Sequence, residues 1–155
     1  MEGPRPPRES EYPQILEFLH RQLRPESSWS INQEYPTVFS PTNLHNIRII
    51  TDETRVLSHA VLKPLIVKTP LAIFKVGAIG SVVTDTQYRG QGFSTKILED
   101  CLVEAKKQSC DFAVLWTQLH DFYRKFDFEL TGTEFSCVIE NEFTVSAISD
   151  LKIIK

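Results

Sequence analysis

The sequence predicts a mixed α/β domain built on a sheet that contains one parallel crossover. Residues 46–83 carry three apolar, β-branched stretches separated by short polar turns, the pattern of antiparallel strands. Apolar residues then recur with the period of a helix over residues 93–105. A short apolar stretch follows at residues 112–116, and a strand, helix and strand in that order need a parallel crossover.

The first part of the chain predicts a tail followed by a helix. Residues 1–8 are rich in proline and charge and are expected to be a disordered tail, so a single domain would occupy residues 9–155. Ser10 can cap the helix, with Pro13 in its first turn. Pro25 ends it, because proline cannot continue a helix.

A second, shorter helix and the three strands come next. The helix is expected over residues 31–39, with Pro36 near a break. The strands are expected at residues 46–50, 55–67 and 71–83. Gly77 and Gly80 interrupt the last of these and indicate a bulge or bend.

The last third of the chain predicts the elements that complete the sheet. The strand at residues 112–116 reads as buried on both faces, because its apolar run does not alternate with polar residues. A short helix is expected over residues 119–125. Strands at residues 128–130 and 133–139 would close the sheet, and residues 143–154 would supply one more strand or a tail.

Composition excludes several classes of partner. The net charge of −3 and the pI near 5.8, with no basic run, argue against nucleic acid. No apolar stretch approaches the length of a bilayer, and the N-terminus does not resemble a signal peptide, so no membrane partner and a cytoplasmic location are expected. Three cysteines without zinc-type spacing predict no metal site, and Cys101 lies on the apolar stripe of the helix as a core residue.

The segment from residue 82 to residue 95 joins a strand, a glycine-bearing loop and a helix in the order that forms an anion cradle. A helix that begins near Gly92 leaves its first N–H groups without partners and adds partial positive charge from its dipole. Gly90 and Gly92 remove the Cβ atoms that would keep phosphate oxygens away, and Arg89 adds a cation. A pyrophosphate would satisfy this arrangement.

Other interpretations of the glycines are a plain turn before a helix or a dinucleotide-binding fingerprint. The fingerprint fails because Thr95 stands where its third glycine should be, and because the polar residues 84–89 separate the strand from the glycines. The phosphate loop of nucleotide triphosphatases is absent, since the sequence has no G-K-[ST].

Two segments carry a family resemblance. Arg89-Gly90-Gln91-Gly92-Phe93-Ser94 resembles the [QR]-x-x-G-x-[GA] signature of the GNAT superfamily of acyl-CoA N-acetyltransferases, with Ser94 as a departure. Phe122-Tyr123-Arg124-Lys125-Phe126-Asp127-Phe128 is similar to the family's F-Y-x-K-x-G-F segment after the fifth strand. Asp127 replaces the glycine there, and aspartate tolerates a left-handed conformation. The resemblance spans residues 47–140.

The resemblance implies a mostly antiparallel sheet with splayed fourth and fifth strands, helices on both faces, and acetyl-CoA as the acyl donor. The pantetheine arm would lie between the splayed strands, with the N–H of Val83 or its neighbour as oxyanion donor, although the two valines also fit a plain core strand. The cofactor-binding residues implied are Val82, Val83, Thr84, Arg89, Gly90, Gln91, Gly92, Phe93, Ser94 and Thr95.

The implied chemistry is transfer of an acetyl group to a primary amine by direct attack in a ternary complex. By resemblance Tyr123 is the general acid for the departing sulfur, since a phenol stays protonated at neutral pH, although it could also be a core aromatic. His59 and His120 are candidate bases by residue type only. The carboxylates Asp52, Glu53 and Asp85 read as solvated, so no base is assigned.

The acceptor is a small-molecule amine or a protein amino group, and the sequence does not choose between them. In the family, variable N-terminal helices form the acceptor pocket, here around Trp29, Tyr35 and Phe39, which also fit core packing. A noncatalytic acyl-CoA-binding or partner-binding module on the same fold is the alternative function. A monomer or a homodimer is expected, and the apolar ending at residues 150–155 also fits a chain cut from a longer protein.

Overall fold

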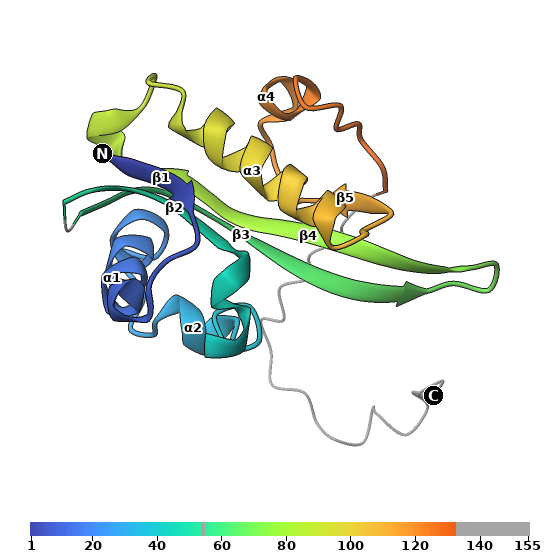
Figure 1. The fold of residues 1–155 in the computed structure, drawn as a ribbon, viewed down its shortest axis with the longest axis horizontal. Helices are drawn as coiled ribbons and strands as arrows, with labels where there is room; N and C mark the ends of the chain where they lie inside the picture. The colour runs from blue at the N-terminus through green and yellow to red at the C-terminus, as the bar shows by residue number, and fades with distance from the viewer. Residues whose placement is uncertain (54, 133–155) are drawn as a thin grey trace, which may run out of the picture. The chain divides into compact units, whose positions relative to one another are not determined.

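A computed structural model of the protein describes residues 1–53 and 55–132 (Figure 1). The chain divides into two compact units, Met1–Gln118 and Leu119–Lys155. The first unit holds the sheet and the helices that pack on it, and the described part of the second holds one short helix.

The first unit is built on a five-stranded sheet in the order β1-β2-β3-β4-β5. All neighbouring strands are antiparallel except β4 and β5, which run parallel. The predicted mixed, mostly antiparallel sheet with one parallel crossover is therefore confirmed. The strands are β1 (Glu2–Arg5), β2 (Ile47–Asp52), β3 (Arg55–Lys68), β4 (Ile73–Thr84) and β5 (Phe112–Val114).

Helices cover both faces of this sheet, as the family resemblance implies. The two N-terminal helices lie on one face and the long third helix crosses the other (Figure 1). They are α1 (Tyr12–Leu23), α2 (Ile31–Glu34) and α3 (Phe93–Lys107), and α4 (His120–Arg124) belongs to the second unit. Short 3-10 turns occupy Glu9–Glu11, Pro41–Asn46 and Thr86–Tyr88.

Each face of the sheet has its own apolar core. The face under α1 and α2 buries a cluster in which β2, β3 and β4 meet both helices: Ile15, Phe18, Leu19, Ile31, Phe39, Ile47, Ile49, Val56, Val61 and Val83. On α3, Ile97, Leu98 and Cys101 are fully buried. Burial raises the pKa of the Cys101 thiol to about 12, so this cysteine is an inert core residue, as predicted.

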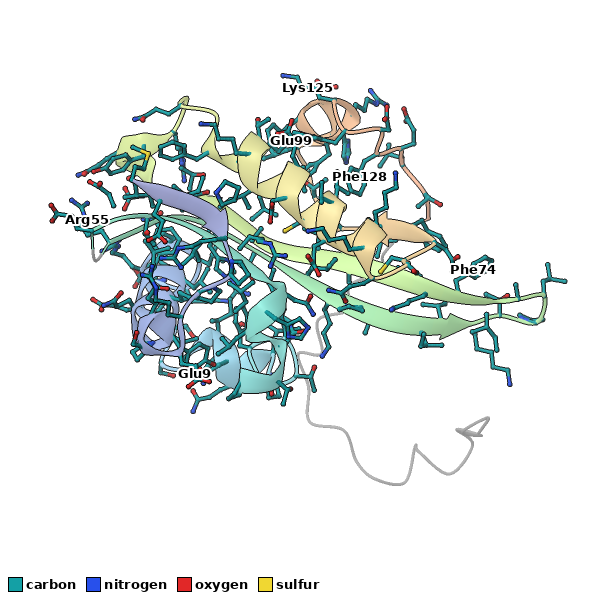
Figure 2. All side chains as sticks on the ribbon, viewed as in Figure 1. Glu9, Arg55, Phe74, Glu99, Lys125 and Phe128 are labelled. Atoms are coloured by element: carbon teal, nitrogen blue, oxygen red, sulfur yellow. The ribbon has the colours of Figure 1, made fainter. Side chains whose placement is uncertain are left out.

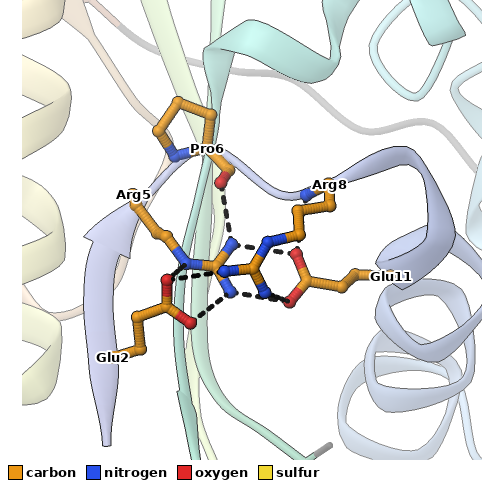
Figure 3. Close-up of polar contacts among 5 residues, drawn as sticks. All are labelled: Glu2, Arg5, Pro6, Arg8 and Glu11. Carbon is orange, nitrogen blue, oxygen red and sulfur yellow. Dashed lines mark hydrogen bonds and ion pairs between the residues drawn. The ribbon is translucent and has the colours of Figure 1, made fainter.

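The N-terminus is a strand, which corrects the expected disordered tail over residues 1–8. β1 pairs antiparallel with β2 at the edge of the sheet, a position in which a proline such as Pro4 is tolerated. The charges pair with one another (Figure 3): Arg5 donates to Glu11 at 2.6 Å and to Glu2 at 3.0 Å. Glu11 also accepts from the backbone N of Arg8 at 2.6 Å. These bonds tie the strand to the start of the first helix.

Several predicted boundaries differ from the structure in the helical region. Ser10 is not the cap of α1, because it lies inside the 3-10 turn that precedes the helix, although Pro13 does sit in the first turn. α2 ends at Glu34 rather than extending to residue 39, because Pro36 disfavours helical geometry at the residue before it.

The end of the sheet also differs. β5 is only three residues long, with Phe112 45% and Trp116 70% exposed, so residues 112–116 are not buried on both faces. Residues 128–130 form no strand within the described chain, and the strands predicted at 133–139 and 143–154 lie outside the described residues. The β3–β4 hairpin, which carries Phe74, extends past the helices (Figure 2). Phe74 packs against Phe112 with ring centroids 5.6 Å apart.

Replacing Arg5 with methionine should destabilise the protein by about 2 kcal/mol, because it removes hydrogen bonds between charged, largely buried groups. The hydrogen bonds from Arg5 lower the pKa of Glu11 to about 2. Their contribution is therefore complete above pH 4.5 and is lost as the pH falls towards 2. Urea unfolding at pH 7 and pH 3 measures both effects. Arg8→Met is the control, since its side chain is 64% exposed, and an equal loss in that variant would contradict the assignment.

Candidate functional site

The loop between β4 and α3 has the geometry of an anion cradle. Gly90 and Gly92 adopt left-handed φ values of 79° and 76°, and Gly92 is the N-cap of α3. Among the described residues, no side chain caps this helix end. A Cβ atom added at either glycine would meet no atom of the described residues within 4 Å, so this part of the chain leaves the space beside the loop open. The positive φ values favour glycine, and the helix end offers its first N–H groups to an anion.

The side chains around this loop are fixed by short-range contacts. Asp85 is buried, accepts from the backbone N of Gln87 at 3.0 Å and pairs with Arg21 at 3.2 Å. The expectation that Asp85 is a solvated carboxylate is therefore wrong, since it caps the turn that leads to the glycines. Arg89 is exposed, and its Nε donates to the carbonyl of Thr84 at 3.4 Å; within residues 1–53 and 55–132 its other N–H groups remain available to a ligand.

A chain of hydroxyl groups connects the start of α3 to the end of β4. Ser94 lies 2.8 Å from Thr84, and Thr84 lies 2.8 Å from Ser58. Ser58 donates to the carbonyl of Val83 at 3.1 Å, so Thr84 must donate to Ser58 and Ser94 to Thr84. The hydroxyl of Ser94, which departs from the family signature, is thus turned towards the sheet and not towards the glycine loop.

β4 is irregular just before the loop. Val61 on β3 faces Gly80 and His59 faces Val83, so that Ser81 and Val82 together oppose one residue of β3. This is a β-bulge, and Ser81 within it has an unusual φ of 50°. A bulge or bend was predicted from Gly77 and Gly80; the bulge follows directly after Gly80, whereas Gly77 pairs regularly with Pro64.

The same stretch of β4 leaves the neighbouring β5 strand. The two strands pair only from Val76 to Ala78, and β5 ends at Val114. Within the described residues, β4 beyond Ala78 therefore has no strand partner on that side. Val83 packs in the core cluster and pairs with His59 on β3, whereas Val82 is half-buried and lies outside the cluster, and both belong to this stretch of β4.

His59 lies under the bulge and is completely buried. Its Nδ1 is 2.9 Å from the carbonyl oxygen of Ser81, and because a carbonyl only accepts, Nδ1 carries the proton. Burial lowers the pKa of His59 to about 4, so the ring is neutral at pH 7. A buried ring cannot take a proton directly from a substrate amine, which removes His59 as a direct base. Sequence reasoning missed its structural role and that of Ser58, because neither residue stands in a motif.

Tyr123 lies in α4 in the second unit, at the centre of an aromatic group. Its ring makes edge contacts with Phe122 and Phe128, with centroids 4.9 Å and 6.0 Å away. Burial raises the pKa of Tyr123 above 10, so its hydroxyl is protonated at neutral pH. Asp127 adopts φ 62°, so the turn after the helix forms with aspartate in place of glycine. His120, the other candidate base, is exposed.

Of the three aromatic residues expected at the acceptor site, one lies in the core and two lie at the surface. Phe39 is buried and stacks on His59 with centroids 6.1 Å apart. Trp29 and Tyr35 are about half exposed, and the Glu34 carboxylate beside Tyr35 raises the pKa of the Tyr35 hydroxyl.

Asp52 is half-buried and Glu53 is exposed at the β2–β3 turn. Among the described residues, no three histidine, cysteine or acidic side chains gather in a metal-binding group, and no helix could cross a bilayer.

The sequence also matches the model of a known protein family. The model described as "Acetyltransferase (GNAT) domain" matches residues 4–131, most of the chain. The protein belongs to the GNAT acetyltransferase family. GNAT enzymes are acetyl-CoA-dependent acyltransferases, so the predicted enzyme class is confirmed together with the fold. The comparison with curated proteins gave no match.

Solved structures agree with the GNAT fold. A predicted acetyltransferase from Clostridium acetobutylicum, solved with acetyl-CoA, has a TM-score of 0.69 and 20% identity, covering 83% of this chain and 90% of that one. Glucosamine-6-phosphate N-acetyltransferase from Arabidopsis thaliana has a TM-score of 0.67 and 18% identity, with coverage of 88% and 97%. A Trypanosoma brucei acetyltransferase has a TM-score of 0.66 and 21% identity, with coverage of 86% and 96%.

The lowered pKa of His59 makes the stability of this GNAT domain depend on pH. Above pH 6.5 the histidine is neutral in both the folded and the unfolded chain, whereas between pH 6.5 and about 4 only the unfolded chain is protonated. Stability should fall by about 3 kcal/mol as the pH drops through this window. His59→Leu should abolish that slope in urea unfolding. The exposed-histidine variant His120→Gln should keep it, and a slope unchanged in His59→Leu would refute the assignment.

Proposed function

We propose that this GNAT domain transfers an acetyl group from acetyl-CoA to a primary amine by direct attack in a ternary complex. The observation that supports it most is the open, uncapped start of α3 at Gly92, beside the exposed cation of Arg89 and directly after the free edge of β4. These features supply, within one continuous segment, an anion site and an unpaired strand edge.

The proposed contacts with the pyrophosphate come mainly from the backbone. Gly90, Gln91 and Gly92 are exposed, whereas Phe93 is buried and Ser94 and Thr95 are half-buried. The N–H groups of this loop and first helical turn would donate to phosphate oxygens, and Arg89 would neutralise part of their charge. The inward hydroxyl of Ser94 leaves the approach to its N–H free, so serine in place of glycine or alanine does not obstruct this role.

The acyl end of the donor would lie along Val82, Val83 and Thr84. An amine that attacks a thioester generates an oxyanion, which is stabilised by N–H donors already aimed at its position. The bulge at Ser81 turns the backbone just before Val82, and the N–H of Val83 or its neighbour is the proposed donor. CoA supplies the activated acyl group, so the protein contributes position and electrostatics.

Tyr123 is the proposed general acid that protonates the departing sulfur. Its burial keeps the phenol protonated, which is the state that a proton donor needs. The acceptor is a primary amine of a small molecule or of a protein. The name of the Arabidopsis relative indicates an amino sugar phosphate for that enzyme, and it supports an amine acceptor here without choosing one.

Acetyl-CoA should raise the melting temperature of the protein. At about a hundred times its dissociation constant, a ligand adds roughly 2.7 kcal/mol, which shifts a domain of this size by several degrees. Arg89→Ala should weaken binding roughly tenfold, because it removes a charge-assisted contact. Lys107→Ala, an exposed cation at the other end of α3, is the control. No shift at saturating acetyl-CoA or CoA would refute the proposed donor site.

Tyr123→Phe should lower kcat about a hundredfold and leave the KM for acetyl-CoA nearly unchanged, because only proton donation is lost. Thiol release with a panel of primary amines measures turnover. Phe128→Leu is the control for disturbed packing in the same aromatic group. Unchanged turnover in Tyr123→Phe would remove the role of Tyr123. Binding of acetyl-CoA without turnover on any amine would favour the noncatalytic acyl-CoA-binding module.

A further inference from the structure

We propose that His59 is a positioning residue for the acyl donor, acting through the carbonyl of Ser81 to hold the backbone of Val82 and Val83 in place. This inference rests on the proposed function, since it assigns the acyl end of acetyl-CoA to that stretch of β4. His59 itself lies in the core and touches no substrate.

The backbone at the bulge has a conformation that needs support. Ser81 has φ 50°, which is unfavourable for any residue with a Cβ atom. The ladder between β3 and β4 is interrupted at the same point, so Ser81 and Val82 lack the regular pairing of the strand. Side chains of β3 are therefore the groups that can hold the carbonyls here.

Two consecutive residues of β3 provide that support from opposite faces of the sheet. His59 donates from Nδ1 to the carbonyl of Ser81 at 2.9 Å, on the α1 face, where its ring stacks on Phe39. Ser58 donates to the carbonyl of Val83 at 3.1 Å and joins the hydroxyl chain that leads to α3. The peptide group before Val82 and the peptide group after Val83 are thereby fixed by side-chain hydrogen bonds.

Packing alone does not account for a histidine at this position. Its Nε2 atom is buried and has no hydrogen-bond partner among the described residues, which costs folding free energy. A leucine would fill similar space in the apolar cluster without that cost. What the histidine adds is one N–H donor directed at the bulge. Because the ring is neutral at pH 7, this donor stays in the same state across the physiological range.

Three variants and one packing control separate the hydrogen bond from packing. His59→Leu removes the donor, whereas His59→Asn keeps an N–H₂ group near the place of Nδ1. Ser81→Gly, added to His59→Leu, relieves the strain of the positive φ and should make the bulge less dependent on His59. Val61→Ala, on the same face of β3, is the control for a loss of core packing that leaves the bond intact.

The readouts are the amide nitrogen and proton chemical shifts of residues 81–83 without ligand, and the kinetics with acetyl-CoA and an amine. We expect His59→Leu to move these amide signals and to lower kcat/KM about tenfold or more, a loss typical of a misplaced reacting group. His59→Asn and the double variant should recover most of the activity. Val61→Ala should lose stability and keep both the signals and kcat/KM.

Two results would overturn the inference. Unmoved amide signals in His59→Leu would show that the bond does not hold the bulge. Equal losses of activity in His59→Leu, His59→Asn and Val61→Ala would show that only core packing matters. Failure of the proposed function is recognised separately, because the wild-type protein would then neither bind nor turn over acetyl-CoA, whatever the amide signals of the variants show.

Discussion

The candidate site depends on one constraint, which is that β4 must belong to the sheet and also leave a free edge. β3 pairs with β4 over nearly its whole length, whereas β5 pairs with it only from Val76 to Ala78. A regular strand at the centre of a sheet would be covered on both sides. The bulge at Ser81 changes the local twist, and in the part of the chain that the structure describes the early end of β5 leaves the following residues of β4 without a strand on one side.

The electrostatics of the loop follow from the same geometry. The chain carries a net charge of −3, so a general excess of positive charge cannot attract an anionic donor. Local groups must do so: Arg89, the dipole of α3 and the uncapped N–H groups after Gly92. Arg55 lies over the ring of Tyr88, 5.8 Å from its centroid, and adds a further cation beside the loop. Short-range, oriented groups of this kind lose little strength to salt screening compared with a diffuse charge.

The parts of the molecule that could be predicted from the sequence are those where the residue type determines the backbone conformation. Gly90 and Gly92 predicted a left-handed loop because few residue types adopt that conformation readily. The helix after them was predicted because its apolar period extends over many residues. The N-terminal strand was missed because prolines and charges are typical of disorder, and only the tertiary contact of Arg5 with Glu11 gives them partners. Asp85 was misread for the same reason, since its partner Arg21 lies 64 residues away.

The chain of hydroxyl groups connects the two ends of the proposed donor site, which are the end of β4 and the start of α3. Ser58, Thr84 and Ser94 each have one hydroxyl proton, and the carbonyl of Val83 can only accept, so every proton in the chain is committed in one direction. Ser94 therefore cannot donate to a phosphate without breaking a bond that reaches back to Val83. Recognition of the pyrophosphate then falls to main-chain N–H groups and Arg89, while the side chains at the helix start keep the end of β4 in register.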